Sequence, residues 1–213
     1  MKPDSATTLA GEFMLAVYLD GQGRVPSYRT GLDFGLSGAM LMELALDGCI
    51  DTVDGHIVAA RAARAARAAR AAQPRDRVLG EVLARIQSSR RPRTAAQWVR
   101  ILSADAHRRL AAELIADGVL VRRPRRLSLP TDPARRYDVL RGERPGAAVR
   151  SSRSGTDDRS AALTALATAC AVTSGDQDGS EYEAAVRSLG PACAQILAAV
   201  AACVWPVALC SWA

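Results

Sequence analysis

The segment Thr30–Asp47 constrains the fold of this 213-residue chain more than any other part of the sequence. Its apolar residues recur every four positions, the spacing of one face of an α-helix: Leu32, Leu36, Met40 and Leu44. Gly48 follows at the position where helices commonly end with a positive φ. Glycines in its first half leave room for another element to approach closely: Gly31, Gly35 and Gly38. The sequence therefore predicts a helix here, closely packed by a neighbour.

Other periodic segments predict further helices. They cover Ser5–Tyr18, Asp76–Ser88, a short segment capped by Thr94, Ala106–Asp117, Ala161–Val172, Tyr182–Leu189 and a last helix after Pro191. Asp54-Gly55, between the strand-like runs Cys49–Val53 and His56–Ala60, predicts a hairpin. A second hairpin is expected to pair Val119–Val121 with Arg126–Leu129, with Pro124 at its tip. The expected fold class is mainly α, a compact single-domain helical fold with two or more short β-hairpins.

Two biased segments interrupt the single domain expected over residues 1–213. Residues 59–73 contain arginines separated by pairs of alanines, at Arg61, Arg64, Arg67 and Arg70. A three-residue step turns each arginine by 300° on a helix, so the four form no tight stripe. We interpret this low-complexity insert as an expanded surface loop. Residues 130–155 are rich in Pro, Gly, Ser and Arg, which is typical of a long loop, here a basic one.

Positive charge is concentrated in one region. The chain has a net charge of +6, and Val121–Arg153 holds ten arginines against three acidic residues. A shorter basic linker lies at Arg90, Arg91, Pro92 and Arg93. A concentrated basic stretch suggests a polyanionic partner, either an anionic membrane surface or nucleic acid. A solvated loop without a partner remains the alternative.

Motifs of catalysis are missing from the sequence. The five cysteines form no CxxC pair and no cluster with the two histidines, which argues against a disulfide framework or a zinc site. The sequence contains neither a phosphate-binding glycine loop nor a nucleophile elbow. We therefore expect no catalytic residue, no metal, no cofactor and no enzymatic activity. The N-terminal segment does not read as a signal peptide. The uncharged segment 192–213 is long enough to span a membrane, but Pro206 and its many alanines favour a buried helix over a tail anchor.

Several segments together resemble the Golgi phosphoprotein 3 family, including its bacterial members. They are Leu9–Gly23, Thr30–Gly55, Trp98–Val121 and Asp158–Ala167, and the run GLSGAMLMELALDG is the most specific. The resemblance implies a compact, mostly helical domain that acts as a peripheral membrane module without catalysis. Eukaryotic members recognise phosphatidylinositol 4-phosphate and serve as adaptors for glycosyltransferases at the Golgi. For this chain it implies a cytoplasmic protein on the inner face of a membrane, and leaves open a protein cargo and a homo-oligomer.

The resemblance also indicates where a lipid headgroup would bind. The family's site tryptophan falls on Tyr28, and its three site arginines fall on Ser37, Ala104 and His107. A histidine carries positive charge only when protonated, so its contribution would fade above about pH 6.5. The candidate headgroup-binding residues are Tyr28, Arg29, His107, Arg108 and Arg109.

The family's apolar hairpin tip is replaced here by arginines at Arg122, Arg123, Arg125 and Arg126. This replacement exchanges membrane insertion for electrostatic attraction. We therefore expect binding to anionic phospholipid, a phosphoinositide among them, with weakened headgroup specificity. The alternative is a basic nucleic-acid-binding protein that uses the helix and hairpin of residues 106–129, which we favour less. A third hypothesis is a soluble scaffold whose arginines only keep it in solution.

Overall fold

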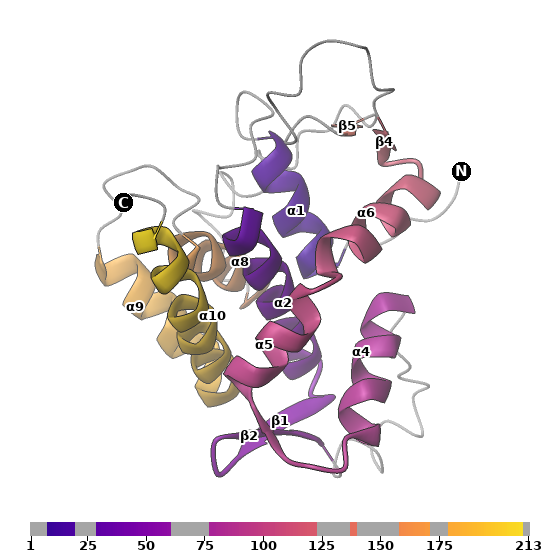
Figure 1. Cartoon of the computed structure of the whole chain (residues 1–213). Helices are drawn as coiled ribbons and strands as arrows, with labels where there is room; N and C mark the ends of the chain where they lie inside the picture. The colour runs from indigo at the N-terminus through magenta and orange to yellow at the C-terminus, as the bar shows by residue number, and fades with distance from the viewer. Residues whose placement is uncertain are drawn as a thin grey trace.

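Helix α2 (Arg29–Leu46) runs through the middle of the protein in the computed structural model, which describes residues 8–19, 29–60, 77–122, 137–139, 158–170 and 179–210 (Figure 1). The helices around it are α1 (Leu9–Leu19), α4 (Arg77–Ser88), α5 (Ala95–Ser103), α6 (Ala106–Ala116), α8 (Asp158–Ala169), α9 (Gly179–Ser188) and α10 (Gly190–Cys210). The strands of the described ranges are β1 (Ile50–Val53), β2 (His56–Ala59), β3 (Arg93–Thr94), β4 (Leu120–Arg122) and β5 (Tyr137–Val139). The mainly α class with short hairpins is confirmed.

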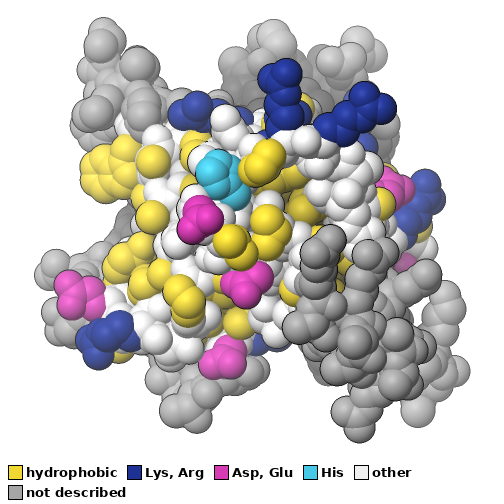
Figure 2. All heavy atoms as spheres, turned by 90° about the horizontal axis from the view of Figure 1, so that it is seen from below, with side chains coloured by type: hydrophobic (Ala, Val, Ile, Leu, Met, Phe, Trp, Pro, Cys, Tyr) yellow, Lys and Arg dark blue, Asp and Glu magenta, His cyan; other side chains and the backbone are white. Residues whose placement is uncertain are grey.

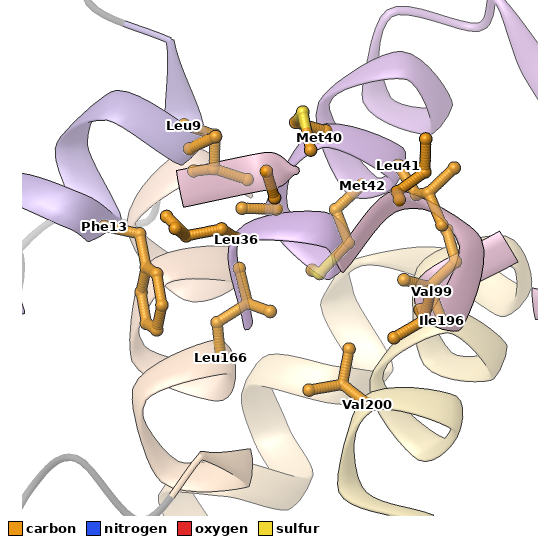
Figure 3. Close-up of a cluster of buried hydrophobic side chains, with 14 of the residues drawn as sticks. Leu9, Phe13, Leu36, Met40, Leu41, Met42, Val99, Leu166, Ile196 and Val200 are labelled. Carbon is orange, nitrogen blue, oxygen red and sulfur yellow. The ribbon is translucent and has the colours of Figure 1, made fainter. Parts of the chain in front are cut away.

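Helix α2 is buried on nearly all sides because its neighbours surround it. It contacts α1, α4, α5, α6, α8, α10 and β1. Its apolar side chains therefore extend well beyond the single face that the four-residue spacing defines, and include Ala39, Leu41 and Met42. Figure 3 shows Leu36 and Met40–Met42 of this helix among Phe13 of α1, Leu166 of α8 and Ile196 and Val200 of α10. A helix that is apolar all round belongs in a core, and this one is its centre.

Two glycines of α2 permit the closest of these contacts. A Cβ atom on Gly35 would lie 2.7 Å from Cys170 Sγ and from Phe13 Cε1. A Cβ atom on Gly38 would lie 2.4 Å from Val200 Cγ2 of α10. These separations are too short for real carbon contacts, so only glycine allows α1, α8 and α10 to pack at this depth. The sequence-based expectation of a close neighbour is thereby confirmed.

The apolar C-terminal segment is a core helix. The inward face of α10 is buried at Cys193, Ile196, Leu197, Val200, Cys203 and Val204. These residues belong to the same apolar cluster as α2, and α10 also contacts α5, α8 and α9. Among the residues that the structure describes, no helix is long and apolar enough to cross a membrane.

The first hairpin forms as predicted. Asp54 and Gly55 both have positive φ, 49° and 76°, as a tight two-residue turn requires, and Val53 pairs with His56. Sequence reasoning missed the third strand, β3, which adds to β2 with Ile57 opposite Arg93. A two-residue strand is too short to show an alternating pattern, and this one lies in the segment interpreted as a basic linker.

Strand β4 pairs with a segment that the sequence did not single out. It lies beside β5 in the register Leu120 to Val139, whereas the expected partner, Arg126–Leu129, lies outside the described residues. Tyr137 and Val139 are aromatic and β-branched, residue types that favour a strand. Strand β5 thus falls inside the segment 130–155 that was interpreted as a loop. The rest of that loop and residues 61–73 of the Ala/Arg insert lie outside the described residues.

A buried carboxylate ties three helices together. Glu43 of α2 accepts a hydrogen bond from the backbone N–H of Leu9 (2.8 Å), the first residue of α1. It also accepts one from Arg159 Nη1 of α8 (3.0 Å), and Arg159 Nε donates to Glu12 of α1 (3.2 Å). The pKa of Glu43 is raised, chiefly by burial and to a smaller extent by Asp47, although Arg159 and the Leu9 N–H act to lower it. Burial would lower the pKa of Arg159, but the two carboxylates raise it above its usual value.

We expect Gly38→Ala to destabilise the protein by about 1–3 kcal/mol, because the added methyl group must displace Val200 of α10. The matched control is Gly80→Ala in α4, where nothing lies within 4 Å of the added atom. That variant should gain about 0.5–1 kcal/mol from helix propensity. Urea unfolding followed by circular dichroism measures both. Two variants of equal stability would contradict the close approach of α2 and α10.

The raised pKa of Glu43 predicts a pH-dependent stability. A carboxyl group with a higher pKa in the folded state binds its proton more tightly there, so acidification favours folding. The contribution of Glu43 is therefore greatest below its ordinary pKa of 4.5 and is lost as the pH rises through the folded-state pKa. We expect the free energy of unfolding of wild type, minus that of Glu43→Gln, to fall as the pH rises from 4.5 toward neutral.

Urea unfolding of wild type and of Glu43→Gln across this pH range measures the difference between their free energies of unfolding. The control variant is Glu183→Gln, which removes an exposed glutamate of α9 that takes no part in the Glu43–Arg159 cluster. If the free energy of unfolding of wild type, minus that of Glu43→Gln, instead grows with pH, then the ion pair with Arg159 affects the pKa of Glu43 more than its burial does.

Candidate functional site

Helix α6 and strand β4 form the part of the structure where most of the described site candidates lie. One face of α6 is buried at Ala106, Leu110, Ala111 and Leu114, and the helix packs on α1 and α2. The backbone N–H of Gly118, whose φ is positive (69°), donates to the Ile115 carbonyl oxygen (3.0 Å), so the chain turns directly into β4. Figure 1 shows α6 leading to the β4–β5 ribbon at one end of the molecule.

This end exposes apolar side chains, and basic residues lie near them in the sequence. The side chains of Ile115 and Val121 are 38% and 39% exposed. Arg108, at the start of α6, is exposed as well. Arg122 closes β4 at the ribbon, although the structure does not describe its side chain. Apolar side chains beside cations are the combination that a membrane surface accommodates.

Arg109 is held by two carboxylates. Its Nη1 donates to Glu81 of α4, and its Nε donates to Asp105 Oδ2 (2.7 Å). Asp105 also lies near Arg108, with 3.9 Å between Arg108 Nη2 and Asp105 Oδ2. Arg77 Nε donates to Glu81 Oε1 (3.1 Å), so the cluster joins α4 to α6. The Arg109 guanidinium is therefore neutralised within the protein.

The cluster also determines what the start of α6 offers to an anion. Asp105 occupies the N-cap position, but its side chain makes no capping hydrogen bond and turns to the arginines instead. A carboxylate beside a helix N-terminus satisfies the helix dipole and repels a second anion. Within the described ranges, no group of three or more His, Cys, Asp or Glu side chains is arranged to hold a metal ion.

The structure separates the headgroup candidates. Ser37, where the family's first site arginine falls, is 0% exposed, and its hydroxyl donates to the Asp33 carbonyl oxygen (2.7 Å). It therefore contacts no ligand at the surface. Ala104 is exposed but presents only a methyl group, and His107 is half-buried on α6. Arg108 and Arg109 share α6: Arg108 is exposed with one distant contact to Asp105, whereas Arg109 is held by both Glu81 and Asp105.

Other candidate site residues lie wholly or partly outside the part of the chain that the structure describes. Tyr28 is not among the described residues, and Arg29 is the first residue of α2, with a side chain that the structure does not describe. Arg123, Arg125 and Arg126 likewise lie outside the described residues. Their assignment to the site remains a prediction from the sequence.

Sequence reasoning missed Glu81 and Asp105. The four-residue spacings Arg77–Glu81 and Asp105–Arg109 are visible in the sequence and indicate ion pairs on a helix. The pair between Glu81 and Arg109 spans 28 positions and appears only when α4 and α6 are placed.

Comparison with protein-family models matches residues 9–204 to Golgi phosphoprotein 3 (GPP34). The match extends from the first described helix into the last and includes the buried α2 and the α6–β4 segment. Because it covers most of the chain, the protein belongs to the Golgi phosphoprotein 3 family. Comparison with curated proteins finds no match.

We expect a double-mutant cycle to detect the bridge between α4 and α6. Glu81→Gln and Arg109→Gln should each destabilise the protein, and the coupling energy between them should be about 0.5–1 kcal/mol, since both side chains are partly solvated. Urea unfolding of wild type, the single variants and the double variant gives this coupling. Strictly additive effects would contradict the ion pair.

Proposed function

We propose that this protein is a non-enzymatic peripheral membrane protein that binds anionic phospholipid on the cytoplasmic face of a membrane. Family membership supports the general class, that of a lipid-binding adaptor. The observation that carries the proposal is the exposure of two apolar side chains, Ile115 and Val121, at the α6–β4 end. Arg108 is exposed two turns earlier on α6, and four arginines follow Val121 closely in the sequence. The aliphatic groups can enter the interface while the arginines contact lipid phosphates.

The same site supports a weakened preference among headgroups. Selective recognition of a phosphomonoester needs several donors fixed around one phosphate group. Here Arg109 is occupied by Glu81 and Asp105, and Ser37 is buried in the core. What remains is Arg108 and the arginines that follow β4 in the sequence, whose charge would attract any anionic surface and would be screened by salt.

The competing proposal, nucleic-acid binding by residues 106–129, has less support. A helix that reads base edges presents polar side chains on its exposed face. Beyond Arg108, the exposed positions of α6 are Ala112, Ile115 and Ala116, and the opposite face is core. These side chains offer almost no donors or acceptors, so a membrane surface fits the helix better.

Vesicle flotation tests the proposal. Neutral phosphatidylcholine vesicles are compared with vesicles that contain phosphatidylglycerol or phosphatidylinositol 4-phosphate at equal surface charge. We expect binding to both anionic kinds, reduced by salt, because the attraction is electrostatic. A strong preference for the phosphoinositide would overturn the weakened specificity, and binding to neither kind would overturn the membrane role.

A quadruple variant locates the membrane contact. Replacing Arg122, Arg123, Arg125 and Arg126 by Ser should weaken binding to phosphatidylglycerol vesicles at least about tenfold, since each arginine near the surface contributes about 1 kcal/mol before screening. The matched control removes the same charge elsewhere, at the exposed Arg85, Arg90, Arg91 and Arg187, and should weaken binding less than about threefold. If the two variants lose the same amount of vesicle binding, binding depends only on the net charge of the protein and not on a defined contact surface.

A further inference from the structure

A second basic feature lies in the turn between α4 and β3, far from the α6–β4 end. From Val82 to Ala104 the chain has no acidic residue and five arginines: Arg85, Arg90, Arg91, Arg93 and Arg100. Arg90 and Arg91 occupy the turn itself and are exposed. No salt bridge involves either of them among the side chains that the structure describes. Their charge is therefore available to a partner.

The backbone that carries these two arginines is fixed by its neighbours. Ser89 Oγ donates to the Arg91 carbonyl oxygen (2.8 Å), and Arg93 Nε donates to Ser89 Oγ (3.4 Å). The Arg93 guanidinium lies 5.6 Å from the centre of the Trp98 ring, within the range of a cation–π contact. Arg93 also pairs with Ile57 of β2. The turn is thus held from α4, from the sheet and from α5.

The residues after the turn fix its other end. Thr94 accepts a hydrogen bond from the Gln97 backbone N–H, and the Gln97 side chain accepts one from the Thr94 N–H, forming a capping box. A site held in one conformation loses less entropy when a partner binds. The backbone that presents the Arg90 and Arg91 side chains is accordingly preorganised.

The location of the turn argues against a membrane as its partner. Figure 1 places the end of α4 and the β1–β2 hairpin at the opposite end of the molecule from the β4–β5 ribbon. Figure 2 views the hairpin end and shows acidic side chains among apolar ones, with arginines toward the edge. Asp47, Asp51 and Asp54 are exposed on the segments that enter and form the hairpin. A flat anionic bilayer would approach these carboxylates as well, whereas a narrow ligand can contact the turn alone.

The surroundings also argue against nucleic acid. Single strands bind through aromatic side chains on which bases stack. The only aromatic residue of the acid-free segment is Trp98, which is 3% exposed and covered by Arg93. The remaining chemistry is paired guanidinium groups, which form charge-assisted hydrogen bonds with carboxylates.

We propose that the Arg90–Arg91 turn is a docking site for an acidic segment of a partner protein. The proposal rests on the proposed function in one respect: if the β4–β5 ribbon faces the membrane, the turn faces away from it. A protein bound to lipid at one end can then hold an acidic partner at the other.

Fluorescence anisotropy with a labelled oligoglutamate peptide at low salt tests the site, using the full chain. We expect Arg90→Ser/Arg91→Ser to weaken binding about tenfold, which corresponds to roughly 1.4 kcal/mol for two exposed charged contacts. The matched control is Arg100→Ser/Arg187→Ser, which removes two exposed arginines outside the turn and should change binding less than about threefold. Equal weakening by both pairs, or no binding by wild type, would overturn the proposal.

Two further readouts separate this proposal from the lipid one. Flotation of Arg90→Ser/Arg91→Ser on phosphatidylglycerol vesicles should match wild type, and a loss would make the turn part of the membrane contact and overturn the proposal. A labelled polyuridine strand should not bind more tightly than the peptide through these arginines, and tighter binding would assign the turn to nucleic acid. If wild type binds the peptide but no vesicles, the docking site stands and the lipid-binding function fails.

Discussion

The depth at which α1, α8 and α10 approach α2 determines the rest of the structure. Gly35 and Gly38 remove the side chains that would hold these helices apart. Phe13, Cys170 and Val200 fill the space, and the other apolar residues of α2 then meet neighbours on every side. The same approach buries Ser37, which lies between the two glycines. Ser37, to which the sequence resemblance assigns a headgroup-site arginine of the family, is thus enclosed in this protein's core.

Arginine–carboxylate pairs have different roles at two places in the structure. Arg159 joins Glu43 and Glu12, and so fixes α1 and α8 to α2 inside the protein. Arg109 joins Asp105 and Glu81, and so fixes α6 to α4 at the surface. Both arginines are used in holding the structure together and are unavailable to a ligand. We therefore infer that any functional charge comes from other arginines: those that follow β4 in the sequence, and Arg90 and Arg91 at the α4–β3 turn.

Local signals made most of the fold predictable from the sequence. The four-residue spacing from Leu32 to Leu44, Asp54-Gly55 and the Thr94 cap each specify structure within a few residues, and each is confirmed. The pairing of β4 with β5 was not predicted, because pairing across 14 intervening residues is set by tertiary structure and not by a local turn signal. The two-residue strand β3 was missed because it is stabilised by β2 and carries no pattern of its own.

The candidate site was less predictable than the fold. Arg108 and Arg109 are adjacent, yet the Arg108 side chain is mostly exposed and the Arg109 side chain is held against Glu81. The two point in different directions because a step of one residue turns a helical side chain by 100°. Asp105 could be found from its spacing, but Glu81 is brought to Arg109 only by the packing of α4. Ser37 lies on an apolar helix, yet only the surrounding helices reveal that it is buried completely.

Hydrogen–deuterium exchange with and without phosphatidylglycerol vesicles tests most directly which end of the protein meets a membrane. Slower exchange on binding is expected over the last turn of α6 and strands β4 and β5, with no change in the turn between α4 and β3, since the two lie at opposite ends (Figure 1). Phosphatidylcholine vesicles should change neither region. Protection of the α4–β3 turn with an unaffected β4–β5 ribbon would contradict the proposed orientation and the membrane contact on which it depends.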